Sequence, residues 1–440
     1  MITLKTSNSK KSYDGIYEDI ANINQIFIPY GLKVSEVIEA SQVIRYVINL
    51  PLDIKLQGKI RRATKDIEYT LISALRSDEI IYKHEEDKLI IERRGEFNIL
   101  PFGNLFTKSF LDNTDGLMLM LGQDLNGKAI YTDLAKAPHI LIAGTTGSGK
   151  SETIHTIIAS LLMRYCYGHN APGIGIIDIK GTEFNKYQGT YPITIVKDAE
   201  NALKMLQTFC TIMDNRYKIL ADANCDDIQE YRQKGNRMQS LVCIIDELAD
   251  LMLQNPDVEK YIVRIAQKAR ACGIHLVIGT QSPRADVVTG LIKANIPFKI
   301  ALNTSTSIES RIIIDTVGAE KLLGKGDMLI KKGGNKPIRA QGCYVYDDDK
   351  IALAKEATNG QHYEIMPASN PQPTIRTTYN TQPIFKDTPS YYSQPTYKPQ
   401  NNSYNPKQYK KPGFFQGLKN LWDAPSNTTP QQFINIISHE

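Results

Sequence analysis

Short apolar runs alternate with longer amphipathic segments over residues 122–357, and this alternation is the strongest pattern in the chain. Five apolar runs predict buried strands: Ile140–Ala143, Ile174–Ile177, Leu241–Ile245, His275–Ile278 and Phe298–Leu302. Three segments between them predict helices: Ser151–Tyr165, Asp198–Ala221 and Val258–Ala271. Strands that alternate with helices favour an α/β fold with a mainly parallel sheet covered on both faces. In such a sheet, ligands bind at the carboxyl ends of the strands.

Two regions that precede this domain have different patterns. Residues 1–22 are polar, and we expect them to be poorly ordered. Residues 23–121 predict a small α/β domain, with strands at Val43–Leu50 and Leu89–Glu92 and a helix at Ile67–Leu75. This region carries no motif with chemistry of its own, so we expect it to have a scaffolding role.

The composition changes again near the C-terminal end. Residues 358–440 are rich in Pro, Gln, Asn and Tyr and follow neither a helical nor a strand period. Such sequences bury too little apolar surface to offset chain entropy, so this pattern predicts a disordered tail. Within it, Phe414–Trp422 is an apolar cluster with flanking lysines and a candidate docking peptide for a protein partner. An incidental apolar patch, or a segment that folds back on the preceding domain, is the alternative.

A glycine-rich segment joins the first apolar run to the first predicted helix. Its residues Gly144, Thr145, Thr146, Gly147, Ser148, Gly149, Lys150 and Ser151 fit the phosphate-loop pattern G-x-x-x-x-G-K-[ST]. The glycines allow backbone N–H groups to turn toward phosphates, and the helix N-terminus adds positive partial charge. We expect the loop to bind ATP, with Lys150 on the β- and γ-phosphates and Ser151 on Mg²⁺.

Two acidic residues follow the apolar run Leu241–Ile245, at the expected carboxyl end of a strand. We expect Asp246 to contact the Mg²⁺ shell and Glu247 to orient and polarise the attacking water. A solvated corner is the alternative for this acidic pair. Gln281 follows the next apolar run and is placed to contact the γ-phosphate, although it also fits a plain strand exit.

Phosphoryl transfer is often assisted by an arginine from a neighbouring subunit. Arg270 and Arg311 are the two candidates for this role. Their spacing does not choose between them, and either fits an ordinary surface ion pair.

Composition restricts the class of protein without naming a partner. The 440 residues include 52 basic and 47 acidic side chains, and the net charge of +5 neither proves nor excludes nucleic-acid binding. Six cysteines are scattered without a C-x-x-C pair, which favours reduced, buried thiols. No apolar run reaches the roughly 18 residues of a membrane span, and the first residues lack a signal core. The sequence therefore predicts a soluble, cytoplasmic protein without a transmembrane segment.

Several segments together resemble the FtsK/SpoIIIE family of DNA translocases. They are Ala143–Ser151, Asp178–Tyr187, Ile245–Met252, Ala266–Leu276, Asp286–Pro297 and Gly318–Leu329, all within residues 120–346. The region from Ile23 resembles, more weakly, the small domain that precedes the motor in that family. The resemblance implies a RecA-like P-loop ATPase motor. It also implies a homo-oligomer, a hexamer, that closes around double-stranded DNA and moves it.

The sequence departs from the family pattern at several points. It shows neither the membrane anchor nor the C-terminal winged-helix module, and Asp226–Tyr231 replaces a segment that tends to carry a pore-facing basic residue. The arginine usual directly after Gln281 is missing, and Arg284 follows the proline. These departures favour a minimal motor of a plasmid, phage or conjugative element.

Two other functions stay open at the level of the sequence. The first is a secretion-system ATPase of the same superfamily that acts on protein substrates. The second is a non-catalytic adaptor for which ATP is only an assembly signal, and the intact pair Asp246–Glu247 argues against it. The ATPase rate with and without linear duplex DNA distinguishes these functions.

Overall fold

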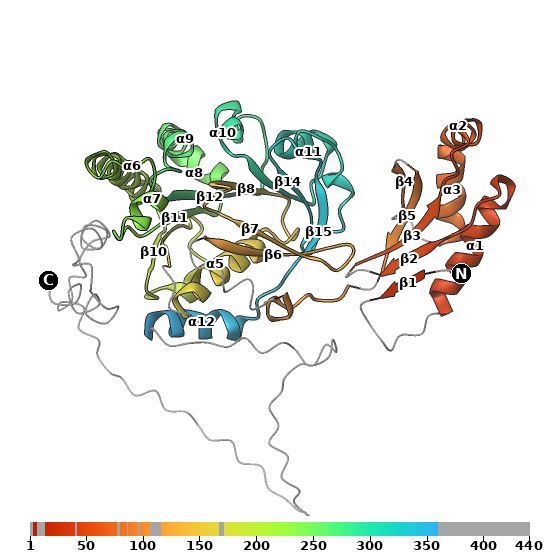
Figure 1. Ribbon diagram of the computed structural model, residues 1–440, viewed down its shortest axis with the longest axis horizontal. Coiled ribbons are helices and arrows are strands. Elements are labelled where there is room, and N and C mark those ends of the chain that lie inside the picture. The colour runs from red at the N-terminus through yellow and green to blue at the C-terminus, as the bar shows by residue number, and fades with distance from the viewer. Residues whose placement is uncertain are drawn as a thin grey trace, which may run out of the picture. The chain divides into compact units, whose positions relative to one another are not determined.

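The computed structural model describes residues 3–6, 14–39, 42–76, 80–85, 87–95, 97–105, 116–166 and 171–359. These residues form an N-terminal domain and a larger α/β domain, whose elements are labelled in Figure 1. Of the predicted tail, only residues 358 and 359 are among them. The Phe414–Trp422 cluster lies outside the described residues.

The N-terminal domain is a five-stranded sheet with helices against one face. The strands lie in the order β1 (Thr3–Thr6), β2 (Glu36–Glu39), β3 (Val43–Asn49), β5 (Lys88–Arg94) and β4 (Ile80–Glu85). The helices are α1 (Asp14–Phe27), α2 (Ile54–Arg62) and α3 (Thr64–Ala74), and the 3-10 turn η1 (Ile28–Tyr30) follows α1. The two strands and the helix that the sequence predicts here are therefore present, close to their predicted bounds.

Helix α1 differs from the prediction that residues 1–22 are poorly ordered. Its residues Ile16, Ile20, Ile23 and Phe27 are buried in the core of the N-terminal domain. Their spacing of three or four residues follows the helical period, which the polar residues between them obscured in the sequence. The domain thus begins before residue 23, because this apolar face covers part of its core.

The larger domain contains a ten-stranded sheet. Its order is β10 (Ile193–Val196), β9 (Gly173–Ile177), β11 (Leu241–Ile245), β12 (Ile274–Thr280), β8 (His139–Ala143), β13 (Phe298–Leu302), β14 (Asp327–Lys332), β15 (Ile338–Gly342), β6 (Met118–Asp124) and β7 (Ala129–Asp133). The first six strands are parallel, and the last four continue the sheet in antiparallel pairs. The predicted α/β fold with a mainly parallel sheet is confirmed, but the predicted boundary at residue 121 divides β6.

Helices cover both faces of this sheet. They are α5 (Lys150–Cys166), α6 (Ala199–Asp222), α7 (Ile228–Gln233), α8 (Leu248–Gln254), α9 (Val258–Lys268), α10 (Gly290–Asn295), α11 (Ser307–Ile314) and α12 (Asp347–Asn359). The 3-10 turns η2 (Phe102–Leu105), η3 (Asn185–Tyr187) and η4 (Ala319–Lys321) complete the elements. In Figure 1, α5 and α12 lie on one face, and α6, α8 and α9 lie on the other.

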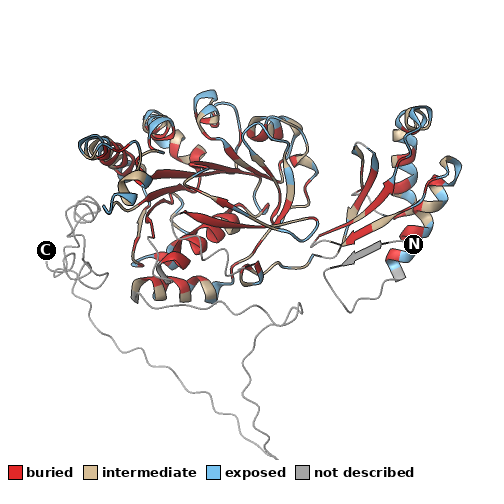
Figure 2. Ribbon diagram, in the orientation of Figure 1, coloured by how far each residue is buried: buried red, intermediate tan, exposed pale blue. Residues whose placement is uncertain are grey.

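Helix α5 is the most deeply buried helix of the site region. Ile154, Ile157, Ile158 and Leu161 are fully buried in the main core, and Figure 2 shows the red of buried residues along this helix. Each such side chain contributes about 1.5–3 kcal/mol when it is removed from water. The start of α5, and the glycine-rich loop before it, are therefore held firmly against the sheet.

A helix, α12, completes the larger domain after its last strand. Strand β15 ends at Gly342, and α12 follows and packs against α5. Leu353, Ala354 and Ala357 of α12 are buried. The three acidic residues of its first turn, Asp347 to Asp349, favour a helix start through the helix dipole. The ordered domain thus includes the whole of α12.

The cysteines agree with the expectation of buried, reduced thiols. Among the described side chains, the free and buried cysteines are Cys210, Cys225, Cys243, Cys272 and Cys343. Burial raises the pKa of Cys243 to about 12, so its thiol is protonated and unreactive near neutral pH.

Candidate nucleotide-binding site

The glycine-rich loop Gly144–Gly149 leaves β8 at the carboxyl edge of the parallel strands and enters α5. Gly147 and Gly149 have φ angles of 77° and 106°, in a region that favours glycine. At Gly149 a Cβ atom would also lie 2.6 Å from the backbone nitrogen of Gly326, which leaves no room for a side chain. The loop is therefore tightly folded, and the first N–H groups of α5 have no partner within the helix.

Lys150 and Asp246 form a buried ion pair at the start of α5. The Lys150 Nζ donates to the backbone oxygen of Asp246 at 2.6 Å and to its Oδ1 at 2.5 Å. Both residues are about 96% buried or more. Phosphate oxygens would compete with the Asp246 carboxylate for this ammonium group.

Glu247 is held by the neighbouring strand. Its Oε1 accepts a hydrogen bond from the Thr280 hydroxyl at 2.7 Å, and its Oε2 accepts from the Gln281 backbone N–H at 2.8 Å. The residue is buried. Strands β11 and β12 are adjacent and parallel, so both carboxyl ends reach the same edge of the sheet. The carboxylate is thus fixed in orientation next to the glycine-rich loop.

Gln281 contacts the loop directly. Its Oε1 accepts a hydrogen bond from the Thr146 hydroxyl at 2.8 Å. Its backbone N–H binds Glu247, so one residue joins the loop to the acidic pair. Gln281 therefore lies against the glycine-rich loop, and its role at the γ-phosphate stays a prediction.

The two candidate arginines are exposed and belong to different parts of the larger domain. Arg270 is exposed in the turn before β12, at the amino end of that strand and so at the opposite edge of the sheet. Arg311 is exposed on α11, which follows β13. Among the described residues, neither side chain has a recorded contact with Gly144–Ser151.

Glu183 is a site residue that the sequence placed only within a family motif. It follows β9, and its Oε1 lies 3.3 Å from the Nε2 of His155, one turn of α5 after Ser151. The hydrogen bond to His155 lowers the pKa of Glu183, with a further contribution from the Ser151 hydroxyl and the nearby Lys150. A buried Asp178 carboxylate fixes this loop by accepting from the backbone N–H of Glu183 at 3.2 Å. Glu183 thus approaches the predicted Mg²⁺ ligand Ser151.

Two further segments complete the walls of the loop. The backbone oxygen of Asn303, just after β13, accepts from the Thr145 N–H at 2.8 Å. The turn Leu323–Asp327, called here the 323–327 turn, packs on the other side. Its Gly326 N–H donates to the Ser148 oxygen at 2.8 Å. The only sequence signal for this turn was its pair of glycines inside the family motif.

These residues fit a magnesium–nucleotide complex. The Ser148 hydroxyl is buried and has no hydrogen-bond partner in the described structure, which suits a group that faces a polar ligand. Ser151 and Asp246 offer the hard oxygen ligands that Mg²⁺ prefers, and Lys150 offers the positive charge that phosphates need. The site therefore has the donors for phosphates and the oxygens for a divalent cation.

Comparisons with known proteins relate the domain that carries this site to DNA translocases. The FtsK/SpoIIIE family profile matches residues 105–285. DNA translocase FtsK of Clostridium acetobutylicum is 38% identical over 376 residues, which cover 82% of this chain and 48% of that protein. DNA translocase SftA of Bacillus subtilis is 46% identical over 251 residues, which cover 55% of this chain and 26% of that protein. The chain thus spans about half the length of these curated relatives or less.

The fold has a counterpart among solved structures. The pCW3 conjugation coupling protein TcpA, in its monomer form with ATPγS, superposes with a TM-score of 0.55 at 25% identity. The match covers 77% of this chain and 99% of that structure. In the described part of the chain, every helix is too short or too polar to cross a membrane. Through the domain that carries the glycine-rich loop, the chain belongs to the FtsK/SpoIIIE family.

Proposed function

We propose that the protein hydrolyses ATP at Gly144–Ser151 and couples hydrolysis to the movement of double-stranded DNA. The observation that carries the ATPase part is the convergence of Lys150, Asp246, Glu247 and Gln281 at one edge of the sheet. These residues come from three strand ends and are joined by hydrogen bonds. Such a constellation suits phosphoryl transfer, which depends on positioning and on charge stabilisation.

Each residue has a distinct task in this proposal. Lys150 neutralises the β- and γ-phosphates, and the amide groups of the loop hold their oxygens. Glu247 accepts a hydrogen bond from the attacking water and orients it toward the γ-phosphate, while Gln281 contacts that phosphate. Mg²⁺, when it is bound to Ser151 and to the water shell of Asp246, would neutralise the charge that develops on the phosphates. The products are ADP and inorganic phosphate.

The oligomeric ring is the second part of the proposal. Arg270 and Arg311 are both exposed, and Arg270 lies at the edge of the sheet opposite the loop of its own chain. An arginine that stabilises the transition state would then come from a neighbouring subunit, as happens in ring-shaped ATPases. A homo-hexamer around DNA supplies such neighbours at every site.

Support for DNA as the substrate comes from the relatives, which carry the name DNA translocase. Similarity to a conjugation coupling protein supports a role in DNA transfer or in the partitioning of a mobile element. Because the chain spans about half of the curated relatives or less, both statements are inferences from a shared motor domain.

The test is the steady-state ATPase rate of the full chain with and without linear duplex DNA. We expect stimulation by DNA, and Lys150→Ala should abolish both the basal and the stimulated rate. A rate that protein substrates raise and DNA leaves unchanged would favour the secretion-system alternative. Nucleotide binding without hydrolysis in the wild type would favour the adaptor.

A further inference from the structure

The N-terminal domain contacts the same turn that packs on the glycine-rich loop. Five residues make this contact, and we call them the interdomain clasp: Gln42, Glu92, Asp327, Arg339 and Gln341. Gln42 and Glu92 belong to the N-terminal domain, whereas the other three lie on β14 and β15 of the larger domain. All five are buried or nearly so, which makes their hydrogen bonds strong and their loss costly.

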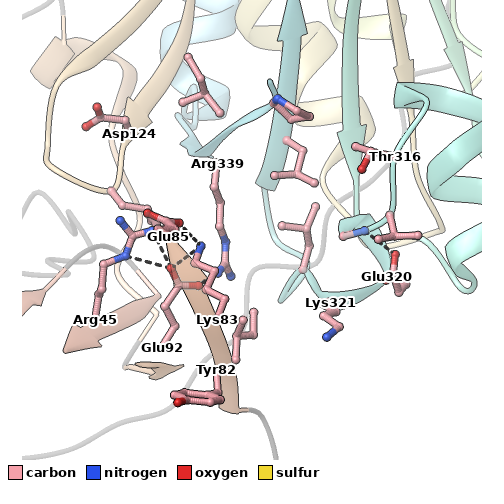
Figure 3. Close-up of a pocket in the computed structure, with 18 of the residues that line it drawn as sticks. Arg45, Tyr82, Lys83, Glu85, Glu92, Asp124, Thr316, Glu320, Lys321 and Arg339 are labelled. Carbon is pink, nitrogen blue, oxygen red and sulfur yellow. Dashed lines mark hydrogen bonds and ion pairs between the residues drawn. The ribbon is translucent and has the colours of Figure 1, made fainter. Parts of the chain in front are cut away.

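The first part of the clasp is ionic. Arg339 binds the two oxygens of Asp327 through its Nε and Nη2, at 3.0 and 2.7 Å. Its Nη1 donates to Glu92 of the N-terminal domain, as Figure 3 shows. Glu92 is 2% exposed, and Arg339, Arg45 and Lys83 together lower its pKa although burial opposes this. Arg339 therefore joins the two domains through a fully charged, two-sided ion pair.

The second part is made by two glutamines. The Nε2 of Gln42 donates to the Gln341 Oε1 at 2.7 Å and to the backbone oxygen of Gly324 at 3.0 Å. The Nε2 of Gln341 donates in turn to the backbone oxygen of Lys325 at 2.9 Å. Gln42 thus binds the 323–327 turn both directly and through Gln341.

The 323–327 turn transmits these contacts to the glycine-rich loop. Asp327 accepts from the Leu323 backbone N–H at 2.8 Å and so closes the turn. Gly326 then donates to Ser148, and its backbone lies close enough to Gly149 to exclude a Cβ atom there. Close packing of two backbones leaves little freedom, so a shift of the turn must move residues 147–149.

The surface beside the clasp is hollow. A cavity of about 480 Å³ lies between the domains, with Tyr82, Lys83, Glu92, Lys321 and Arg339 in its wall (Figure 3). Beside this cavity, the directional polar contacts of the clasp join the two domains. Polar contacts of this kind can exchange partners when the N-terminal domain is displaced.

We propose that the N-terminal domain sets the conformation of the phosphate-binding loop through the interdomain clasp. Gln42 and Glu92 are positioning residues for nucleotide binding, although neither approaches the nucleotide. A force on the N-terminal domain, such as a pull from DNA or a neighbouring subunit, then changes the affinity for nucleotide. This inference rests on the proposed role of Gly144–Ser151 as the nucleotide site.

The experiment compares Gln42→Met with Gln57→Met in the full chain. Methionine preserves the volume of glutamine and removes its donors. Gln57 is the matched control, because its Nε2 binds only the Pro51 oxygen within the N-terminal domain, at 2.8 Å. We expect Gln42→Met to bind a fluorescent ATP analogue roughly threefold to thirtyfold more weakly, the usual range of coupling through a contact network, while Gln57→Met stays at the wild-type value.

Two further measurements make the result specific. Hydrogen exchange of the amides at 144–150 and 323–327 should be faster in Gln42→Met and unchanged in Gln57→Met. Thermal denaturation curves of both variants serve as the check that each is folded. The effects of Gln42→Met and Gln341→Met on affinity should be non-additive, because both act through the same turn. Wild-type affinity and wild-type exchange in a folded Gln42→Met would overturn the clasp.

The nucleotide site itself is tested separately. If Lys150→Ala binds the analogue as tightly as the wild type, the site is wrongly assigned. In that case the exchange measurement still reports whether Gln42 orders the loop. Faster exchange at 323–327 alone, without a change at 144–150, would show that the turn does not transmit the contact and would also overturn the proposal.

Discussion

The substitution Glu247→Gln separates water activation from nucleotide binding. The reason is that the hydrogen-bonding partners of Glu247 can pair with a glutamine side chain as well as with the carboxylate. The Glu247 carboxylate accepts from the Thr280 hydroxyl and the Gln281 backbone N–H. A glutamine carbonyl can still accept from Gln281, and its NH₂ group can donate to the Thr280 oxygen, since a hydroxyl both donates and accepts. The substitution thus leaves no buried polar group unpaired, and we expect the fold and the Lys150–Asp246 pair to persist.

The loss of activity should be large. An amide accepts no proton, and a positioned general base contributes about 10²- to 10⁴-fold to the rate. That factor corresponds to about 3–5 kcal/mol of activation free energy. We therefore expect kcat to fall by about 100-fold or more, while the dissociation constant for ATP changes by less than about threefold.

Single-turnover hydrolysis measures the loss of rate, and equilibrium binding of a fluorescent ATP analogue measures the dissociation constant. Thr280→Val is the companion variant, because it removes one of the two hydrogen bonds and keeps the shape of the side chain. It should lower kcat by only about 2- to 10-fold, the value of one net hydrogen bond. Wild-type hydrolysis by Glu247→Gln, or equal losses in the two variants, would refute the assigned role of this carboxylate.

Three other predictions test the remaining parts of the proposal. Glu183→Gln should raise the Mg²⁺ concentration needed for tight ATP binding by roughly tenfold or more, because groups behind a metal ligand tune metal affinity; an unchanged Mg²⁺ titration would contradict this. DNA binding should weaken steeply with salt and equally on two unrelated duplexes, since phosphate contacts dominate, and a preference for one sequence at high salt would count against it. A chain that ends at Asn359 should keep the ATPase rate, because α12 is complete, and should lose DNA processing in the native host if the tail recruits a partner.

Contiguous patterns in the sequence predicted the central part of the fold and the elements that carry the candidate site. The five strands at the centre of the larger sheet are where their apolar runs placed them. The glycine-rich loop lies between a strand and a helix, and the acidic pair follows the end of β11. These features depend on neighbours along the chain, because a strand period, a glycine at positive φ and a helix start are local properties.

Features that depend on distant partners were missed or misplaced. Helix α1 and helix α12 have apolar faces, but polar residues within each of them hid the period in the sequence. The antiparallel strands from β14 to β7 carry no signal of their own order, since β6 pairs with β15 across more than two hundred residues. The sequence therefore divided β6 between two domains.

The residues around the glycine-rich loop also separate into those predicted from local sequence and those placed by the tertiary structure. The sequence alone determined a strand, a glycine-rich loop, a helix and an acidic pair, because each is written in a few adjacent residues. Only the tertiary structure brought Glu183 to His155, Gly326 to Ser148 and Gln42 to Gln341. Gln42 and Gln341 are 299 positions apart, and a pair of side chains has no sequence pattern at that distance. Their contact exists because two separately formed sheets meet, and that meeting is decided by packing.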